Sequence, residues 1–216
     1  MSKINYDQEY ISNKVFEFIY DCALRDATLQ QAFKGKKDWI KEIDEARQRM
    51  RVFTDRLLSG CFESENDYNG CFLSTVNTIC EIINNNKPAD AIDSFSFGNA
   101  QKLINMTAKY VYTLCYMKPE MRDRFRFCHC PMDSIMLDRV WRKYEEEFGT
   151  EKRKNDLEKS DDFHKGWGAE GLNDEYGQPK LNAFPHRYEL YQNAVKNLIG
   201  DGDLYPIEYD FLIWKQ

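Results

Sequence analysis

The chain has 216 residues, 42% of them hydrophobic and 14% aromatic, which is enough apolar material for one sizeable core or two small helical lobes. Charged residues make up 31%, the mean hydropathy is -0.70, and no stretch approaches the roughly 20 apolar residues of a membrane-spanning helix, so we expect no membrane protein. The first 14 residues lack the apolar run of a secretory signal, which favours a cytoplasmic location.

Apolar residues recur at helical spacing along most of the chain, and no segment shows a convincing strand pattern. We therefore expect an all-α protein, arranged as one domain over residues 1–216. Glycine and proline mark the ends of the predicted helices, with Gly60 as the stop of the second. The predicted helices cover residues 6–32, about 39–57 or further to Gly60, 68–85, about 99–117, 133–144 or further, 186–200 and 205–214.

Two stretches read as loops. Residues 118–126 form a basic segment, and residues 150–184 lose all periodicity and are rich in Gly, Asp, Lys and Glu, which is typical of a long loop.

Seven cysteines, an odd number without a secretion signal, favour free thiols in a reducing compartment. Cys128, His129 and Cys130 are residue types that bind zinc. Their spacing differs from that of structural sites, which use matched Cys-x2-Cys pairs, so we expect no metal.

The formal net charge of -6 argues against simple electrostatic binding of nucleic acid. Residues 97–143 are an exception, with nine basic and four acidic side chains. This local excess of positive charge is either a phosphate-facing surface or an ordinary solvated face, and charge alone favours the second.

Three polar residues lie on one face of the predicted fourth helix, since Lys102, Asn105 and Lys109 are spaced i, i+3 and i+7. Gly98 precedes them at a turn, where a helix N-terminus offers free N–H groups to a phosphate. Repulsion between two lysines favours a neutral amine on one of them, and a neutral amine can form a Schiff base. The simpler interpretation is that both lysines point into water.

Asp133 follows Pro131 at the start of the predicted fifth helix. As an N-cap it would accept hydrogen bonds from the first backbone amides of that helix. It can also border a cleft, where its carboxylate would deprotonate an amine or stabilise positive charge on a deoxyribose ring.

These residues together resemble the helix-hairpin-helix DNA glycosylases, and most closely their archaeal 8-oxoguanine glycosylase branch. That branch has a Gln-Lys pair early in the helix after the hairpin, a lysine two turns later, a Pro-x-Asp segment about thirty residues on and an Asp/Trp pair at i, i+4. The matching residues here are Gln101, Lys102, Lys109, Pro131, Asp133, Asp210 and Trp214.

The resemblance implies a helix-hairpin-helix fold with two helical lobes around a cleft, and a DNA glycosylase with AP-lyase capability. Lys102 would attack C1′ of a nucleotide with a damaged or modified base, such as 8-oxoguanine, and Asp133 would assist it. Lys109 and Asn105 would be auxiliary, and Asp210 and Trp214 would bind the flipped base. Gly98, Asn99 and Gln101 would contact the DNA backbone. The resemblance implies no cofactor.

Some features depart from that family. Only Gly98 remains of the usual Gly-x-Gly hairpin, and the acidic segment 150–184 has no counterpart. The alternatives are a glycosylase relative that binds DNA without chemistry, or a non-catalytic helical module for protein or DNA interaction, in phage or host defence for example. We expect a monomer in either case.

Overall fold

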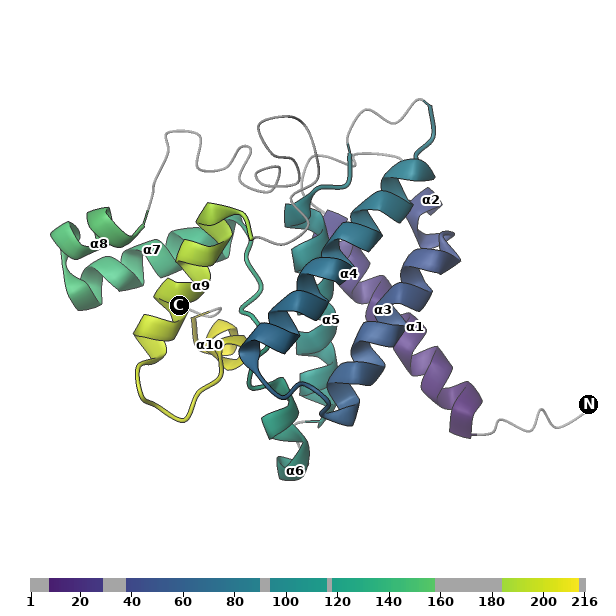
Figure 1. Cartoon of the computed structure of the whole chain (residues 1–216), viewed down its shortest axis with the longest axis horizontal. Coiled ribbons are helices and arrows are strands. Elements are labelled where there is room, and N and C mark those ends of the chain that lie inside the picture. Colours follow the sequence, from purple (N-terminus) through teal and green to yellow (C-terminus); the bar gives the residue numbers. More distant parts are fainter. Residues whose placement is uncertain (1–7, 29–37, 90–93, 116–117, 158–183, 214–216) are drawn as a thin grey trace, which may run out of the picture.

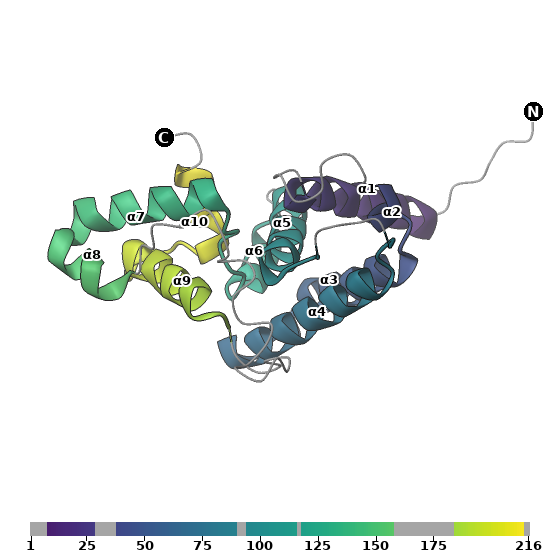
Figure 2. The same cartoon turned by 90° about the horizontal axis from the view of Figure 1, so that it is seen from above.

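The computed structural model describes residues 8–28, 38–89, 94–115, 118–157 and 184–213, and within these ranges it is helical without strands, which confirms the all-α prediction (Figures 1 and 2). The elements are α1 (Gln8–Thr28), α2 (Asp38–Lys41), α3 (Asp44–Ser59), α4 (Glu65–Asn85), α5 (Phe97–Cys115), α6 (Pro119–Arg122), the 3-10 helix η1 (Asp123–Phe125), α7 (Ser134–Phe148), α8 (Thr150–Asp156), α9 (His186–Ile199) and α10 (Pro206–Ile213).

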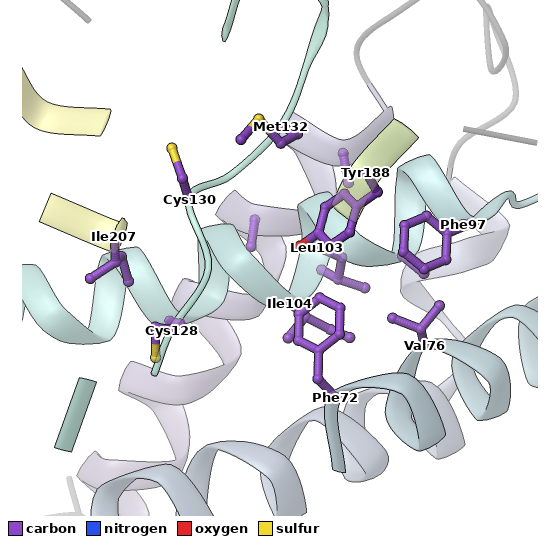
Figure 3. Packing of buried hydrophobic residues seen from close by; sticks show 14 of the residues in the cluster. Phe72, Val76, Phe97, Leu103, Ile104, Cys128, Cys130, Met132, Tyr188 and Ile207 are labelled. Carbon is purple, nitrogen blue, oxygen red and sulfur yellow. The ribbon is translucent and has the colours of Figure 1, made fainter. Parts of the chain in front are cut away.

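The helices form two lobes, which Figure 2 shows side by side. Helices α1 to α5 make the N-terminal lobe, in which α5 packs against α1 and α4, and α3 packs against α4. Helices α7 to α10 make the C-terminal lobe, in which α9 packs against α7 and α10. A connector, residues 128–133, runs in extended form from the end of the 3-10 turn to the start of α7 (Figure 3). Its side chains Cys128, Cys130 and Met132 are fully buried.

Several boundaries differ from the sequence prediction for local reasons. The predicted second helix is divided into α2 and α3 by a turn in which the N–H of Ile43 bonds to the carbonyl of Ile40. Gly60 ends α3 as predicted, because its backbone adopts a left-handed conformation (φ 71°) that glycine accepts without strain. Helix α4 begins three residues earlier than predicted, where Ser64 caps the N–H of Asp67.

Both predicted loops contain helix. The basic segment folds into α6 and η1, and Pro119 occupies the first turn of α6, where its missing N–H is not needed. Helix α8 occupies the beginning of the predicted long loop, and residues 158–183 lie outside the described residues. The seven residues of α8 are all polar or charged, so this helix has no apolar face and the search for helical periodicity missed it.

A polar cluster connects α10 with α5 and α6. Glu208 accepts hydrogen bonds from Arg122 Nε and Nη2, each at 2.7 Å, and from the hydroxyl of Tyr112. Burial raises the pKa of Glu208, but the bonds from Arg122 and Tyr112 lower it, and the net shift is downward. The carboxylate is therefore ionised, and this anchor fixes the helix that carries Asp210.

All seven cysteines are free thiols, as predicted. None of the helices in the described part of the chain is long and apolar enough to cross a membrane.

Candidate functional site

A cleft of about 640 Å³ lies between the lobes, and it is lined by four of the site residues predicted from the sequence, namely Lys102, Lys109, Asp133 and Asp210. We call it the central cleft. Its walls come from α1, α5, the connector, α7 and α10, and they consist of Asp26, Lys102, Met106, Lys109, Tyr110, Thr113, Pro131, Asp133, Ile135, Met136, Arg139, Asp210 and Phe211. Segments more than one hundred residues apart thus contribute to one site.

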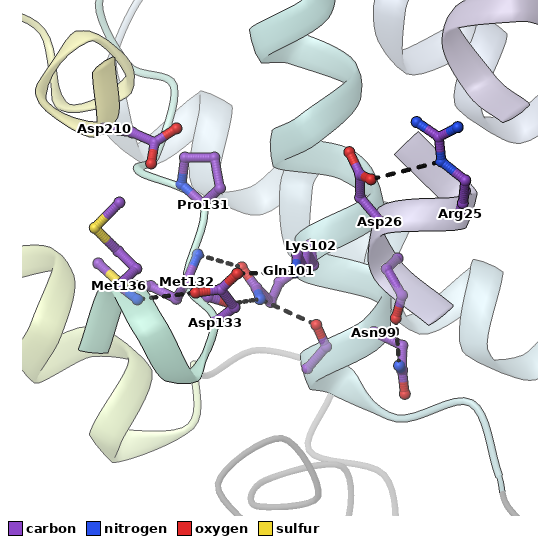
Figure 4. A network of polar contacts seen from close by, with 12 residues as sticks. Arg25, Asp26, Asn99, Gln101, Lys102, Pro131, Met132, Asp133, Met136 and Asp210 are labelled. Carbon is purple, nitrogen blue, oxygen red and sulfur yellow. Dashed lines mark hydrogen bonds and ion pairs between the residues drawn. The ribbon is translucent and has the colours of Figure 1, made fainter. Parts of the chain in front are cut away.

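Lys102 and Asp133 meet across this cleft, as Figure 4 shows. Lys102 Nζ lies 2.9 Å from Asp133 Oδ2, and the two side chains are 16% and 27% exposed. The pair is therefore sheltered but open to a ligand. This contact meets the geometric requirement of the hypothesis, because assisted nucleophilic attack needs near-contact geometry.

Local structure fixes both partners of this pair. Helix α5 begins with reciprocal capping, in which Asn99 Oδ1 accepts from the N–H of Ser96, and Ser96 Oγ accepts from the N–H of Asn99. Lys102 follows within the next turn. Asp133 is the N-cap of α7, since its Oδ1 accepts from the N–H of Met136 at 2.8 Å. One carboxylate thus serves as helix cap and as partner of Lys102, so the two interpretations of Asp133 are compatible.

A second ion pair lies deeper in the central cleft. Lys109 Nζ bonds to Asp210 Oδ2, and their side chains are only 13% and 4% exposed. The ring of Phe211 lies under Lys109, with its centroid 4.6 Å from Nζ. Burial raises the pKa of Asp210 even though the Lys109 charge opposes that shift. Neither lysine simply points into water, which was the simpler prediction for both.

Two of the three residues predicted to contact the DNA backbone have other partners in the structure, and the third lies inside a helix. Gln101 is completely buried and bonds to the backbone of Met132, so its amide is not available to a phosphate. Asn99 caps α5 and donates to the carbonyl of Ala27 at 2.8 Å. Gly98 lies inside the first turn of α5, not at a hairpin before it, because capping by Ser96 starts the helix earlier.

Asn105, predicted as auxiliary, is also completely buried. It donates to Gln101 Oε1 and to the hydroxyl of Tyr188, so it supports the cleft from behind and does not line it. Trp214 lies outside the described residues.

The cleft includes residues that the sequence analysis did not identify. Asp26 accepts a hydrogen bond of 2.5 Å from the hydroxyl of Tyr110, and Arg139 Nη1 donates to the carbonyl of Ile213 at 2.5 Å. Nothing in the local sequence distinguishes Asp26 or Arg139 from the solvated charges of other helices. Only the crossing of α1, α5 and α7 brings them to the site.

Most of the predicted basic excess of residues 97–143 is neutralised locally. Carboxylates lie within ion-pair distance of Lys102, Lys109, Arg122, Arg126, Arg142 and Lys143. These basic side chains could bind phosphate only if the phosphate replaced their carboxylate partners.

His129 is buried between the lobes, and both ring nitrogens have hydrogen-bond partners, Tyr188 and Asn69. Within the described ranges, no group of three or more His, Cys, Asp or Glu side chains is placed to hold a metal ion.

Comparison of the chain with models of known protein families, with curated proteins and with solved structures found no match.

Proposed function

We propose that the protein is a cytoplasmic, monomeric DNA glycosylase with AP-lyase capability, in which Lys102 is the nucleophile and Asp133 its proton acceptor. The observation that supports this most directly is the 2.9 Å contact between Lys102 Nζ and Asp133 Oδ2 in a cleft large enough for a flipped nucleotide. A helix-hairpin-helix arrangement of the two lobes is part of the same proposal.

The reaction begins with a proton transfer from the Lys102 ammonium to Asp133, which leaves a neutral amine. Nζ then forms a bond to C1′, while the glycosidic bond breaks and its electron pair leaves with the base. The alkylated nitrogen passes a second proton to the departing base. Asp133 returns its proton to O4′ as the C1′–O4′ bond breaks, and the product is an iminium ion between C1′ and Nζ.

Strand cleavage would follow from the iminium ion. Loss of a C2′ proton and departure of the 3′ phosphate complete a β-elimination, and water then releases Lys102. The Asp133 carboxylate, whose pair with Lys102 is partly exposed to solvent, would stabilise the positive charge of the iminium ion after it has returned its proton.

The base would occupy the rest of the central cleft. Asp210 supplies hydrogen-bond acceptors for the base edge, and Met106, Pro131 and Phe211 supply apolar walls. Trp214 remains a proposed stacking residue. The modified base itself is proposed as 8-oxoguanine or a related lesion.

Borohydride trapping tests this function. Duplexes that carry 8-oxoguanine, another modified base or an abasic site are incubated with the wild type, with Lys102→Gln and with Lys109→Gln. We expect a covalent adduct that Lys102→Gln alone loses, by about 10⁴-fold or more in rate. Loss in Lys109→Gln alone would move the nucleophile to Lys109. No adduct and no base release on any duplex would overturn the proposal.

A second candidate, a non-catalytic interaction module, is favoured by one surface feature. An apolar groove between α1 and α5 exposes Ile11, Val15, Phe18 and Leu114, with Phe18 70% exposed. This candidate predicts DNA binding that is weak and insensitive to salt, because phosphate contacts would make affinity fall steeply as salt rises. A salt titration of DNA affinity therefore separates it from the glycosylase.

A further inference from the structure

The connector that ends at Asp133 is held by two buried glutamines, one from each lobe. Gln101 of α5 donates to the carbonyl of Met132 at 2.5 Å and accepts from its N–H at 3.4 Å. Gln192 of α9 donates to the carbonyl of Cys130 at 2.8 Å and accepts from its N–H at 3.1 Å. Each carboxamide thus satisfies both backbone groups of one connector residue, and we call the two together the glutamine clamp.

Residue chemistry explains why this clamp suits the connector. A buried extended segment without a neighbouring strand needs partners for each N–H and C=O, and glutamine is both donor and acceptor. Pro131, between the two clamped residues, has no N–H to satisfy. The side chains of Gln101 and Gln192 are 0% and 5% exposed, so water does not compete for these bonds.

A hydrogen-bond chain behind the clamp fixes the orientation of Gln101. Asn105 Nδ2 donates to Gln101 Oε1 at 3.1 Å and to the Tyr188 hydroxyl at 3.0 Å. Tyr188 in turn lies 2.9 Å from Nδ1 of His129, whose Nε2 lies 2.9 Å from Asn69 Oδ1. The chain therefore links α4, α5 and α9, and it holds the Gln101 amide with its nitrogen toward Met132.

Sequence adjacency connects the clamp with the catalytic pair. Gln101 directly precedes Lys102, and Met132 directly precedes Asp133. The backbone contact between residues 101 and 132 is thus one residue away from the side-chain contact between residues 102 and 133 (Figure 4). Any slip of the connector along α5 would separate Nζ from the carboxylate before either side chain changed its rotamer.

We propose that Gln101 and Gln192 are positioning residues, which set the distance between Asp133 and Lys102 across the lobe boundary. This inference rests on the proposed glycosylase function. It predicts that loss of the clamp lowers the rate of the chemical step and leaves DNA affinity unchanged, because neither glutamine lines the cleft.

The test compares Gln101→Leu, Gln192→Leu and Gln192→Glu with the wild type in single-turnover trapping at saturating DNA. We expect the trapping rate to fall by about 10- to 100-fold in both leucine variants, as for small misplacements of reacting groups. Gln192→Glu keeps the acceptor for the Cys130 N–H but places a carboxyl group against the Cys130 carbonyl in a buried site, so its rate should also fall below that of the wild type. The DNA dissociation constant should not change.

Asn84→Leu is a matched control. Asn84 clamps Phe95 in the same manner, with bonds of 2.7 and 3.0 Å to its N–H and carbonyl, but lies outside the cleft and the connector. Its loss should lower thermal stability without a change in trapping rate. If Gln101→Leu does not fold, the two Gln192 variants carry the comparison.

A double-mutant cycle with Asp133→Asn identifies the residue through which the clamp acts. If Gln192 acts by placing Asp133, then Gln192→Leu should have no further effect on the rate once Asp133 is replaced. Unchanged trapping in folded clamp variants, or an equal rate loss in the Asp133→Asn background, would overturn the proposal. Failure of the wild type to form any adduct would instead reject the glycosylase function itself.

Discussion

The two lysine–carboxylate pairs of the central cleft differ in how far water reaches them and in how their carboxylates are held. Asp133 of the first pair is 27% exposed and also caps α7, so it is held by a backbone N–H and remains open to a ligand. Asp210 of the second pair is 4% exposed, and burial raises its pKa despite the nearby Lys109. The first pair therefore suits proton exchange with a ligand, whereas the second shapes the floor of the cleft.

This difference implies that the two pairs contribute differently to stability and to binding. The first pair costs the fold little, because both groups retain some water and Asp133 is useful as a cap. The second pair is desolvated, and ion pairs of this kind are often no more stabilising than apolar side chains of similar volume. Its presence is easier to understand as a requirement for binding than as a contribution to stability.

The largest expected effect comes from Asp133→Asn. Asparagine is as good an N-cap as aspartate, so α7 should persist, whereas the proton acceptor of Lys102 is lost. We expect the single-turnover rate of adduct formation to fall by about 10²- to 10⁴-fold. A thermal melt of the same variant, expected to match that of the wild type closely, is the control. A normal trapping rate would reduce Asp133 to a cap and a structural partner of Lys102.

Asp210→Asn should act mainly on stability. The change leaves the Lys109 ammonium buried without its counter-charge, which typically costs about 3–5 kcal/mol of unfolding free energy. Urea unfolding measures this loss. The double variant Lys109→Met/Asp210→Leu removes both charges and should recover most of the stability while base binding stays impaired. A double variant as unstable as the single one would show that the pair itself stabilises the fold.

Local patterns in the sequence predicted the helical class and the N-cap role of Asp133, whereas the pairing of Lys102 with Asp133 was implied by the resemblance to the glycosylases. Helical periodicity located α4, α5 and α9, and Asp133 carries the signal of an N-cap after Pro131. Long-range contacts were not predictable in the same way. The resemblance implied that Gln101 contacts the DNA backbone, and only the path of the connector buries this residue.

The ion pair deep in the cleft could also not be predicted from local sequence patterns. Lys109 and Asp210 are 101 residues apart, and no spacing rule joins them. The resemblance gave them separate roles, with Lys109 as an auxiliary residue and Asp210 as a contact to the flipped base. The same holds for Gln192, which lies among the apolar residues of α9 and shows no sequence signal for a contact with Cys130.

The smallest expected effect concerns the hydrogen-bond chain behind the first pair. Burial lowers the pKa of His129 to about 3, so the imidazole is neutral in the folded protein at pH 7. The unfolded chain has a histidine pKa of about 6.5 and binds a proton below that value, which the folded protein does not. Stability should therefore fall as the pH drops below about 6.5, by about 1.4 kcal/mol per unit, until the folded pKa near 3 is reached.

Urea unfolding between pH 7.5 and 5 tests this expectation. Comparison of the wild type with variants shows whether His129 or one of the two ion pairs causes the pH dependence. We expect the wild type to lose about 2 kcal/mol of unfolding free energy over this range, and His129→Gln to start less stable with a flatter pH profile. Burial raises the pKa of Asp210, so this carboxyl contributes to the pH dependence with the opposite sign to His129. If His129→Gln retained the full slope, the pH dependence would belong to other groups, and the neutral imidazole of His129 would not be what links Tyr188 to Asn69.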